Sequence, residues 1–166
     1  MPKKILLICT GNTCRSSMAE ALLKKLLAET FGPGAAEYEV CSAGVAVIPG
    51  DRAAAAAVEV MREEGLDLTG HRATPLTPEA AAAADVILTM TTAHKQAVLA
   101  LVPSIQAKVF TLKEYGRGRP GAEDTAGDDI ADPFGAAADV YRACAGELKE
   151  ALWQLVRRLE RETADN

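Results

Sequence analysis

The stretch CTGNTCRS, at residues 9–16, combines side chains and backbone that together suit the transfer of a phosphoryl group. Cys9 supplies a thiol, which becomes a strong nucleophile when it loses its proton. The glycine-containing turn at residues 10–14 can direct its backbone N–H groups inward as a nest for an anion, and the planar fork of Arg15 matches phosphate oxygens. Such a site would hold Cys9 as a thiolate beneath a bound phosphate, in line to attack phosphorus.

A cysteine in this position also has a simpler interpretation, because a buried cysteine often acts only as a small apolar side chain. The spacing of Cys9 and Arg15 alone would not exclude that interpretation. Here, however, the pattern follows an apolar run at residues 5–8, contains Gly-Asn, and passes through Arg-Ser into a helical segment. A strand, a turn and a helix in this order favour a phosphate-binding loop, to which the helix adds the positive end of its dipole.

An acid for the same chemistry stands far along the chain, in DDIADPFG at residues 128–135. Asp132 precedes a proline and could present its carboxyl group rigidly over a site. Taken alone, this segment would be interpreted as a turn before a helix, where Asp, Pro and Gly are common. Beside a loop that contains Cys9 and Arg15, we expect Asp132 to be the general acid that protonates the leaving group.

The elements that must position these residues alternate between strands and helices, which predicts a three-layer α/β domain with a parallel sheet. Ligands of such a sheet bind beyond the carboxyl ends of its strands, where Cys9 lies. Asp51 is expected to cap the second of the main helices. Strands are predicted at residues 5–8, 38–42, 85–90 and 108–112, helices at 16–30, 53–64, 92–101 and 136–160, a short helix from Thr77-Pro78, and a loop at 116–131.

Composition narrows the class of protein. The 166 residues, 49% hydrophobic and 25% charged, fit one globular domain at 1–166. The net charge is −5 and there is no basic stripe, so nucleic acid is not an expected partner. No apolar run approaches the roughly 20 residues that span a bilayer, and no signal-peptide pattern is present. We therefore expect a cytoplasmic protein that acts away from membranes.

The cysteines and histidines are not arranged as metal ligands. None of the cysteines forms a C-x-x-C pair, and His71 and His94 lie far apart in the sequence. This argues against a zinc site, and the absence of a secretion signal argues against a disulfide scaffold. We expect neither a metal nor a cofactor, which leaves a reactive thiol as the informative option. The four cysteines are Cys9, Cys14, Cys41 and Cys144.

The motifs together resemble those of the low-molecular-weight protein tyrosine phosphatase family. They occur in the same order as in that family and extend over nearly the whole chain: CTGNTCRS at 9–16, SAG at 42–44, GHR at 70–72 and DPFG at 132–135. The resemblance implies a four-stranded parallel sheet with helices on both faces. It also implies a phosphocysteine intermediate, with Cys9 as nucleophile, Arg15 as phosphate clamp and Asp132 as general acid and then base.

The same resemblance implies a network of hydrogen bonds that shapes the loop and steadies the thiolate. His94 has no counterpart in this match and is expected on the surface. The implied network consists of Asn12, Ser16, Ser42 and His71. The implied phosphate-binding loop consists of Thr10, Gly11, Asn12, Thr13, Cys14, Arg15 and Ser16.

Within the family, the likeness is greatest to the bacterial protein-arginine phosphatases. These carry threonine at the position of Thr13, where tyrosine phosphatases usually have a larger aliphatic residue. The segment FTLKEY at 110–115, and DPFG instead of Asp-Pro-Tyr-Tyr, fit the same branch. A threonine hydroxyl can form a hydrogen bond with a polar guanidinium. The expected pocket contains Phe134 but lacks a second aromatic residue that would help to sandwich a phenol ring. The expected substrates are phosphoarginine-containing proteins, with Thr13 and Phe134 setting specificity, and phosphotyrosine is the alternative.

Other classes explain the sequence less well. Arsenate reductases share the fold and the loop but need two further cysteines on a mobile segment, and this chain has none between Cys41 and Cys144. Phosphocarrier domains of sugar transport place a cysteine after their first strand, but Arg15 and Asp132 would then be unexplained. A non-catalytic phosphoprotein binder would be expected to lack the nucleophile or the acid.

Cys14 leaves two interpretations open. It lies in the same loop as Cys9 and could form a reversible disulfide with it after oxidation. It could equally pack beneath the loop without any chemical role. The expected oligomeric state is a monomer or a weak dimer.

Overall fold

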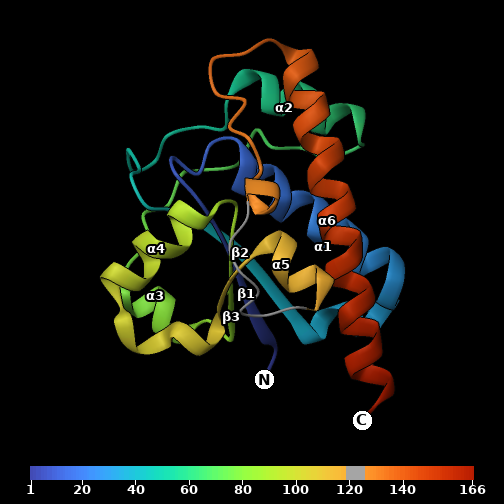
Figure 1. Cartoon of the computed structure of the whole chain (residues 1–166). Helices are drawn as coiled ribbons and strands as arrows, with labels where there is room; N and C mark the ends of the chain where they lie inside the picture. The colour runs from blue at the N-terminus through green and yellow to red at the C-terminus, as the bar shows by residue number, and fades with distance from the viewer. Residues whose placement is uncertain (119–125) are drawn as a thin grey trace.

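The computed structural model describes residues 1–118 and 126–166, which form a sheet between layers of helices (Figure 1). The four strands are all parallel and follow the order β2-β1-β3-β4. This architecture confirms the predicted three-layer α/β fold. The strands are β1 at Lys3–Cys9, β2 at Tyr38–Gly44, β3 at Val86–Thr89 and β4 at Val109–Thr111.

Helices connect the strands and cover the sheet. Among the helices of residues 1–118 and 126–166, none is long and apolar enough to cross a membrane. The α-helices are α1 at Arg15–Phe31, α2 at Ala55–Glu63, α3 at Pro78–Ala83, α4 at Thr92–Leu101, α5 at Leu112–Arg117 and α6 at Ala138–Ala164. The 3-10 helices are Gly32–Glu37, Pro103–Lys108 and Ala126–Asp128.

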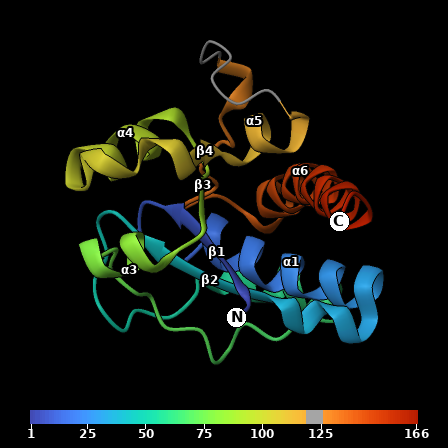
Figure 2. The same ribbon diagram turned by 90° about the horizontal axis from the view of Figure 1, so that it is seen from below.

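Both faces of β1 are buried, as its continuous apolar run predicts. Alternate side chains of a strand point to opposite faces of the sheet. Ile5 and Leu7 therefore pack with the apolar side chains of α1 and α6, whereas Leu6 and Ile8 pack with those of α3 and α4. Figure 2 shows α1 and α6 on one side of the strands and α3 and α4 on the other.

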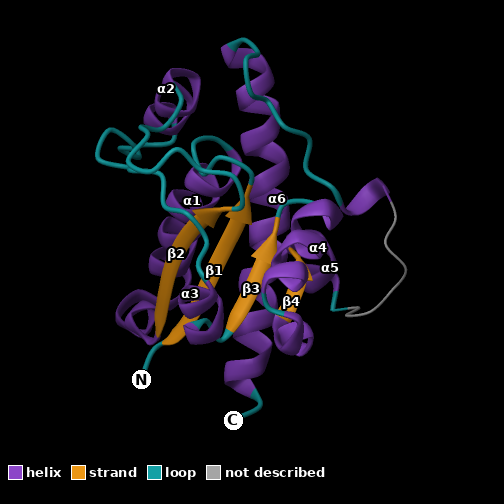
Figure 3. Ribbon diagram, turned by 90° about the vertical axis from the view of Figure 1, so that its left-hand side faces the viewer, coloured by secondary structure: helices purple, strands orange, loops and turns teal. Residues whose placement is uncertain are grey.

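The carboxyl ends of the parallel strands meet at one edge of the sheet (Figure 3). Cys9 is the last residue of β1 and pairs in register with Gly44, the last residue of β2. Because α1 begins at Arg15, the cysteine and the arginine stand at the two ends of a short connection, residues 10–14. The fold thus delivers both to the edge where ligands of such sheets bind.

Asp51 does not cap α2, and that prediction is wrong. The helix begins at Ala55, and Ala54 before it has an extended backbone with no side-chain cap. The backbone N–H of Ala54 donates to the carbonyl oxygen of Thr13 at 3.0 Å, and that of Ala73 donates to the carbonyl oxygen of Asp51 at 2.7 Å. These bonds hold residues 51–54 against Thr13 and Ala73 in a non-helical conformation. The helix therefore begins only at Ala55, and Asp51 lies in the preceding loop.

The predicted strand at 108–112 is too long because Leu112 already begins α5. Thr111 caps this helix, since its hydroxyl oxygen accepts a hydrogen bond from the backbone N–H of Glu114 at 3.2 Å. The predicted loop at 116–131 therefore loses its first residues to α5, and its residues 119–125 lie outside the described residues. The last helix extends beyond the predicted 136–160 range at its end, and its predicted apolar stripe is buried: Tyr141, Cys144, Leu148, Leu152, Leu155 and Leu159.

Candidate active site

Hydrogen bonds to outward-facing carbonyl groups hold the loop between β1 and α1. In a peptide unit the C=O of one residue and the N–H of the next point in opposite directions. Carbonyl groups fixed outward therefore direct the following N–H groups into the loop, as an anion nest requires. The bonds are Val45 N to Cys9 O, Ala46 N to Thr10 O and Ala54 N to Thr13 O, each at 3.0 Å, and His71 Nε2 to Asn12 O at 2.6 Å.

Asn12 fixes the shape of this loop from inside. Its φ of 58° is the only positive value for a residue other than glycine in the described part of the chain, and asparagine tolerates this conformation. Its Nδ2 donates to the hydroxyl oxygens of Ser16 and Ser42 at 2.8 and 2.9 Å. Its Oδ1 accepts from the backbone N–H of Thr74 at 2.9 Å. All polar atoms of this fully buried side chain are thereby paired.

The thiol of Cys9 is buried and contacts Ser16, whose hydroxyl oxygen lies 2.8 Å from the sulfur. Asn12 already donates a hydrogen bond to this hydroxyl oxygen. The hydroxyl hydrogen of Ser16 is therefore free to point at the sulfur. A donor aimed at the sulfur stabilises negative charge there.

Gly44 brings the end of β2 into close contact with the floor of the loop. A Cβ atom at this position would lie 2.4 Å from the carbonyl oxygen of Thr10 and 3.0 Å from the backbone nitrogen of Asn12. No side chain fits in this space, so steric hindrance explains why the SAG motif has glycine at position 44.

Arg15 joins the phosphate loop to the segment that carries Asp132. Its side chain is buried, and its Nη1 donates to the carbonyl oxygen of Ile130 at 2.9 Å. Its Nη2 lies 3.4 Å from Oδ2 of the exposed Asp132 carboxylate. The Nε of Arg15 has no hydrogen-bond partner among the described residues, so this buried donor is available to a phosphate oxygen.

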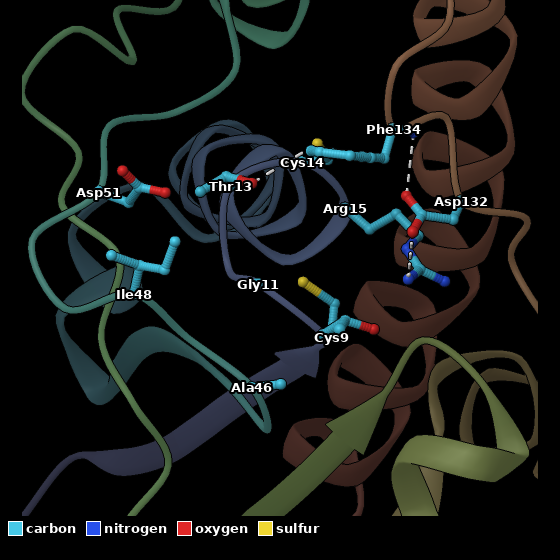
Figure 4. A pocket seen from close by; sticks show the side chains of 11 residues that line it. Cys9, Gly11, Thr13, Cys14, Arg15, Ala46, Ile48, Asp51, Asp132 and Phe134 are labelled. Carbon is cyan, nitrogen blue, oxygen red and sulfur yellow. Dashed lines mark hydrogen bonds and ion pairs between the residues drawn. The ribbon is translucent and has the colours of Figure 1, made fainter.

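These residues line one pocket (Figure 4). Cys9 and Gly11 lie at its base, with Thr13 beside them, while Asp132 and Phe134 stand on one side and Ile48 and Asp51 on the other. Within the residues that the structure describes, no cluster of His, Cys, Asp or Glu side chains could hold a metal ion. The lining consists of Cys9, Thr10, Gly11, Thr13, Cys14, Arg15, Ala46, Ile48, Asp51, Asp132 and Phe134.

His94 is not on the surface, and that prediction is wrong. Only 6% of the residue is exposed, because the first turn of α4 packs against the phosphate loop. Its Nε2 lies 2.8 Å from the hydroxyl oxygen of Thr10, and its Nδ1 has no partner among the described residues. Burial, followed by the nearby positive charge of Arg15, lowers the pKa of His94 to about 4. His94 is therefore neutral at neutral pH.

The lowered pKa of His94 makes the free energy of unfolding depend on pH. An unfolded histidine binds a proton below about pH 6.5, whereas the folded protein resists protonation of His94 until about pH 4. The free energy of unfolding should therefore fall as the pH drops through this window. A His94→Gln variant should show a shallower fall, measured by urea unfolding at several pH values. Equal slopes in the parent and the variant would contradict this assignment.

Cys14 belongs to the lining of the pocket and also contacts α6. Its sulfur lies 3.2 Å from the hydroxyl oxygen of Tyr141 on α6, and burial raises the pKa of its thiol. To form a disulfide with Cys9, this sulfur would have to leave Tyr141. A redox role for Cys9 and Cys14 stays a prediction.

The structure brings the predicted support residues together and adds others that the sequence did not indicate. Ser42, which accepts from Asn12, donates its own hydroxyl hydrogen to Oε1 of Glu20 at 2.7 Å. Thr74 and His94 also contact the loop. Glu20 follows Ser16 by one helical turn, and this spacing on α1 was the signal that could have identified it.

Comparison with known proteins matches nearly the whole chain. Residues 4–165 match the family model described as low molecular weight phosphotyrosine protein phosphatase. A protein-arginine-phosphatase of Bacillus subtilis (strain 168) is 42% identical over 158 residues, which cover 95% of this chain and 97% of that protein.

Solved structures agree with this match. The YwlE arginine phosphatase from Geobacillus stearothermophilus superimposes with a TM-score of 0.85 at 38% identity, covering 99% of this chain and 97% of that one. A YwlE arginine phosphatase mutant with a phosphorylated active-site serine superimposes with a TM-score of 0.82 at 42% identity, covering 95% of each chain. This chain belongs to the low molecular weight phosphotyrosine protein phosphatase family.

Proposed function

We propose that this protein is a protein-arginine phosphatase, which hydrolyses the phosphorus–nitrogen bond of phosphoarginine in phosphorylated proteins. The observation that carries this proposal is the pocket in which Cys9, Arg15 and Asp132 meet, with Thr13 in its wall. Relatives named protein-arginine-phosphatase support the choice of substrate.

In the first step, the Cys9 thiolate attacks phosphorus in line with the leaving nitrogen. The sulfur–phosphorus bond forms and the phosphorus–nitrogen bond breaks, while protonated Asp132 gives its proton to the nitrogen and the protein leaves with an unphosphorylated arginine side chain. The inward N–H groups of the loop and the guanidinium of Arg15 stabilise the charge that spreads over the phosphoryl oxygens.

In the second step, water replaces the cysteine. Asp132, now a carboxylate, takes a proton from the water as its oxygen attacks phosphorus. The sulfur–phosphorus bond breaks, which releases inorganic phosphate and returns Cys9 to the thiolate. The hydrogen bond from Ser16 to this sulfur stabilises the thiolate as the departing group.

Thr13 supports phosphoarginine over phosphotyrosine because its side chain lines the channel above Cys9. Its hydroxyl offers a polar contact to a guanidinium, which an aliphatic side chain of similar size would not. Phosphotyrosine remains the second candidate, because the family is named for it and Phe134, 75% exposed at the mouth, offers one ring face to a phenol.

Replacing Thr13 with isoleucine should lower kcat/KM for phosphoarginine by roughly ten- to hundredfold, the effect of one lost polar contact. Activity on phosphotyrosine should hold or rise, because the added apolar surface suits a ring. The measurement is kcat/KM for matched phosphoarginine and phosphotyrosine peptides in the parent and the variant.

Two further variants separate the hydroxyl from the added bulk. Thr13→Val removes the hydroxyl at nearly constant volume and should reproduce most of the loss. Thr13→Ser keeps the hydroxyl and should retain most of the activity on phosphoarginine. If the parent itself prefers the phosphotyrosine peptide, the phosphatase is a tyrosine phosphatase and the proposal of arginine specificity is wrong.

A further inference from the structure

Asp51 stands in the wall of the substrate pocket, opposite Asp132, and belongs to no predicted motif. Figure 4 shows it on the side of the opening away from Asp132, beside Ile48, with Thr13 between it and Cys14. The residue is exposed, so its carboxylate is accessible from the channel. Because Asp51 does not cap α2, its position in the pocket wall indicates another role for its carboxylate.

The backbone around Asp51 is held firmly on both sides. Its N–H donates to the carbonyl oxygen of Ile48 at 3.1 Å, and its carbonyl oxygen accepts from the N–H of Ala73 at 2.7 Å. Three residues later, Ala54 bonds to the carbonyl oxygen of Thr13 in the phosphate loop itself. Asp51 thus keeps a fixed position relative to the reacting centre.

Arg52 follows Asp51 in the sequence and pairs with Arg72 in an isolated β-bridge, and both arginines are directed elsewhere. The guanidinium of Arg72 donates to the carbonyl oxygens of Thr69 and His71 at 3.2 and 2.8 Å. Arg52 lines a separate groove, with Glu59 among its neighbours. The negative charge of Asp51 is therefore left to act on the contents of the pocket.

We propose that Asp51 binds the guanidinium of phosphoarginine at the nitrogens that do not carry phosphate, and so sets the preference for arginine. This inference rests on the proposed function. The guanidinium has several N–H donors, and donors that lose water in a pocket need acceptors. Asp132 meets this need less well in the first step, because as the acid it is protonated and carries no negative charge. Among the described residues that line the pocket, Asp51 is the remaining carboxylate.

A phenol ring gives this carboxylate nothing to bind. The charge of Asp51 also repels the phosphate dianion of any substrate, and only a guanidinium compensates for that repulsion. The same residue thus favours phosphoarginine and disfavours phosphotyrosine. Discrimination by one attraction and one repulsion is a common route to specificity.

The test is kcat/KM of the parent and of Asp51→Asn on matched phosphoarginine and phosphotyrosine peptides. For phosphoarginine we expect a loss of about threefold to thirtyfold, since the contact is charged but partly hydrated. The loss should lie mostly in KM, because the guanidinium is bound alike in the ground and transition states. For phosphotyrosine, activity should stay constant or rise. Asp51→Lys should enlarge both effects.

Glu29→Gln is the matched control, because it removes one exposed negative charge from α1, outside the lining of the pocket. It should leave the ratio of the two substrates unchanged. If the parent hydrolyses phosphoarginine well and Asp51→Asn keeps the parental ratio, the inference about Asp51 is overturned and the proposed function stands. If the parent does not hydrolyse phosphoarginine, the proposed function fails, and the role of Asp51 fails with it.

Discussion

Replacing Cys9 with serine should abolish turnover, with a loss on the order of 10⁴- to 10⁶-fold, as expected when the nucleophile of an enzyme is removed. A serine hydroxyl stays protonated near neutral pH, which slows the first step, and it leaves poorly from phosphorus, which blocks the second step and stops turnover. The phosphate loop itself should persist, because its shape depends on Asn12 and on bonds to its carbonyl groups. The measurement is kcat with a phosphoarginine peptide, together with the affinity for inorganic phosphate.

Two controls accompany this substitution. Cys41→Ser changes an exposed thiol on β2 and should leave kcat at the parental value. Treatment of the parent with EDTA should also leave it unchanged, since Cys9 supplies the nucleophile and Arg15 the positive charge. Substantial turnover by Cys9→Ser, or loss of parental activity on chelation, would contradict the phosphocysteine mechanism.

Replacing Asp132 with alanine should lower kcat on phosphoarginine by roughly 10²- to 10⁴-fold, the usual contribution of a general acid or base. The carboxyl group stands at the pocket beside Arg15 Nη2, where it can reach the leaving nitrogen. For p-nitrophenyl phosphate, whose leaving group needs no proton, the release of nitrophenol in the first turnover should fall much less. Rapid-mixing kinetics of that release checks the expectation.

Asp129→Asn is the control for this substitution. Asp129 lies close in sequence, and its Oδ1 accepts a hydrogen bond from the backbone N–H of Thr92 at 2.8 Å. Asparagine keeps that acceptor, so activity should be near that of the parent. An equal loss on both substrates for Asp132→Ala would show that Asp132 supports the structure of the loop and is not the acid.

The sequence predicted the fold, and the connection between β1 and α1 that carries the proposed phosphate loop, because both follow from local patterns. The apolar run at residues 5–8 demands a strand buried on both faces, and such strands occur in parallel sheets between helices. Topology then places Cys9 at the carboxyl edge of the sheet without further information. The order of strand, turn and helix around residues 10–14 is visible in the sequence, whereas the hydrogen bonds that hold the turn come from distant segments.

The residues that the sequence did not place depend on contacts between distant segments. His94 lies on an ordinary helical segment, and only the packing of α4 against the loop buries it against Thr10. Asp51 carries a common signal for a helix cap, but backbone bonds to other loops override that signal. Long-range hydrogen bonds of this kind leave no period or motif in the sequence.

Gly44 also determines how the specificity of this enzyme could be redesigned. Ile48 and Phe134 are 71% and 75% exposed at the mouth of the pocket, so an engineer could exchange them with little cost to the fold. The base has no such freedom, since even a methyl group on Gly44 would collide with the carbonyl oxygen of Thr10. Directed evolution could therefore broaden the range of substrate side chains that enter the pocket, while the evolved variants would keep Gly44 and the loop that it contacts.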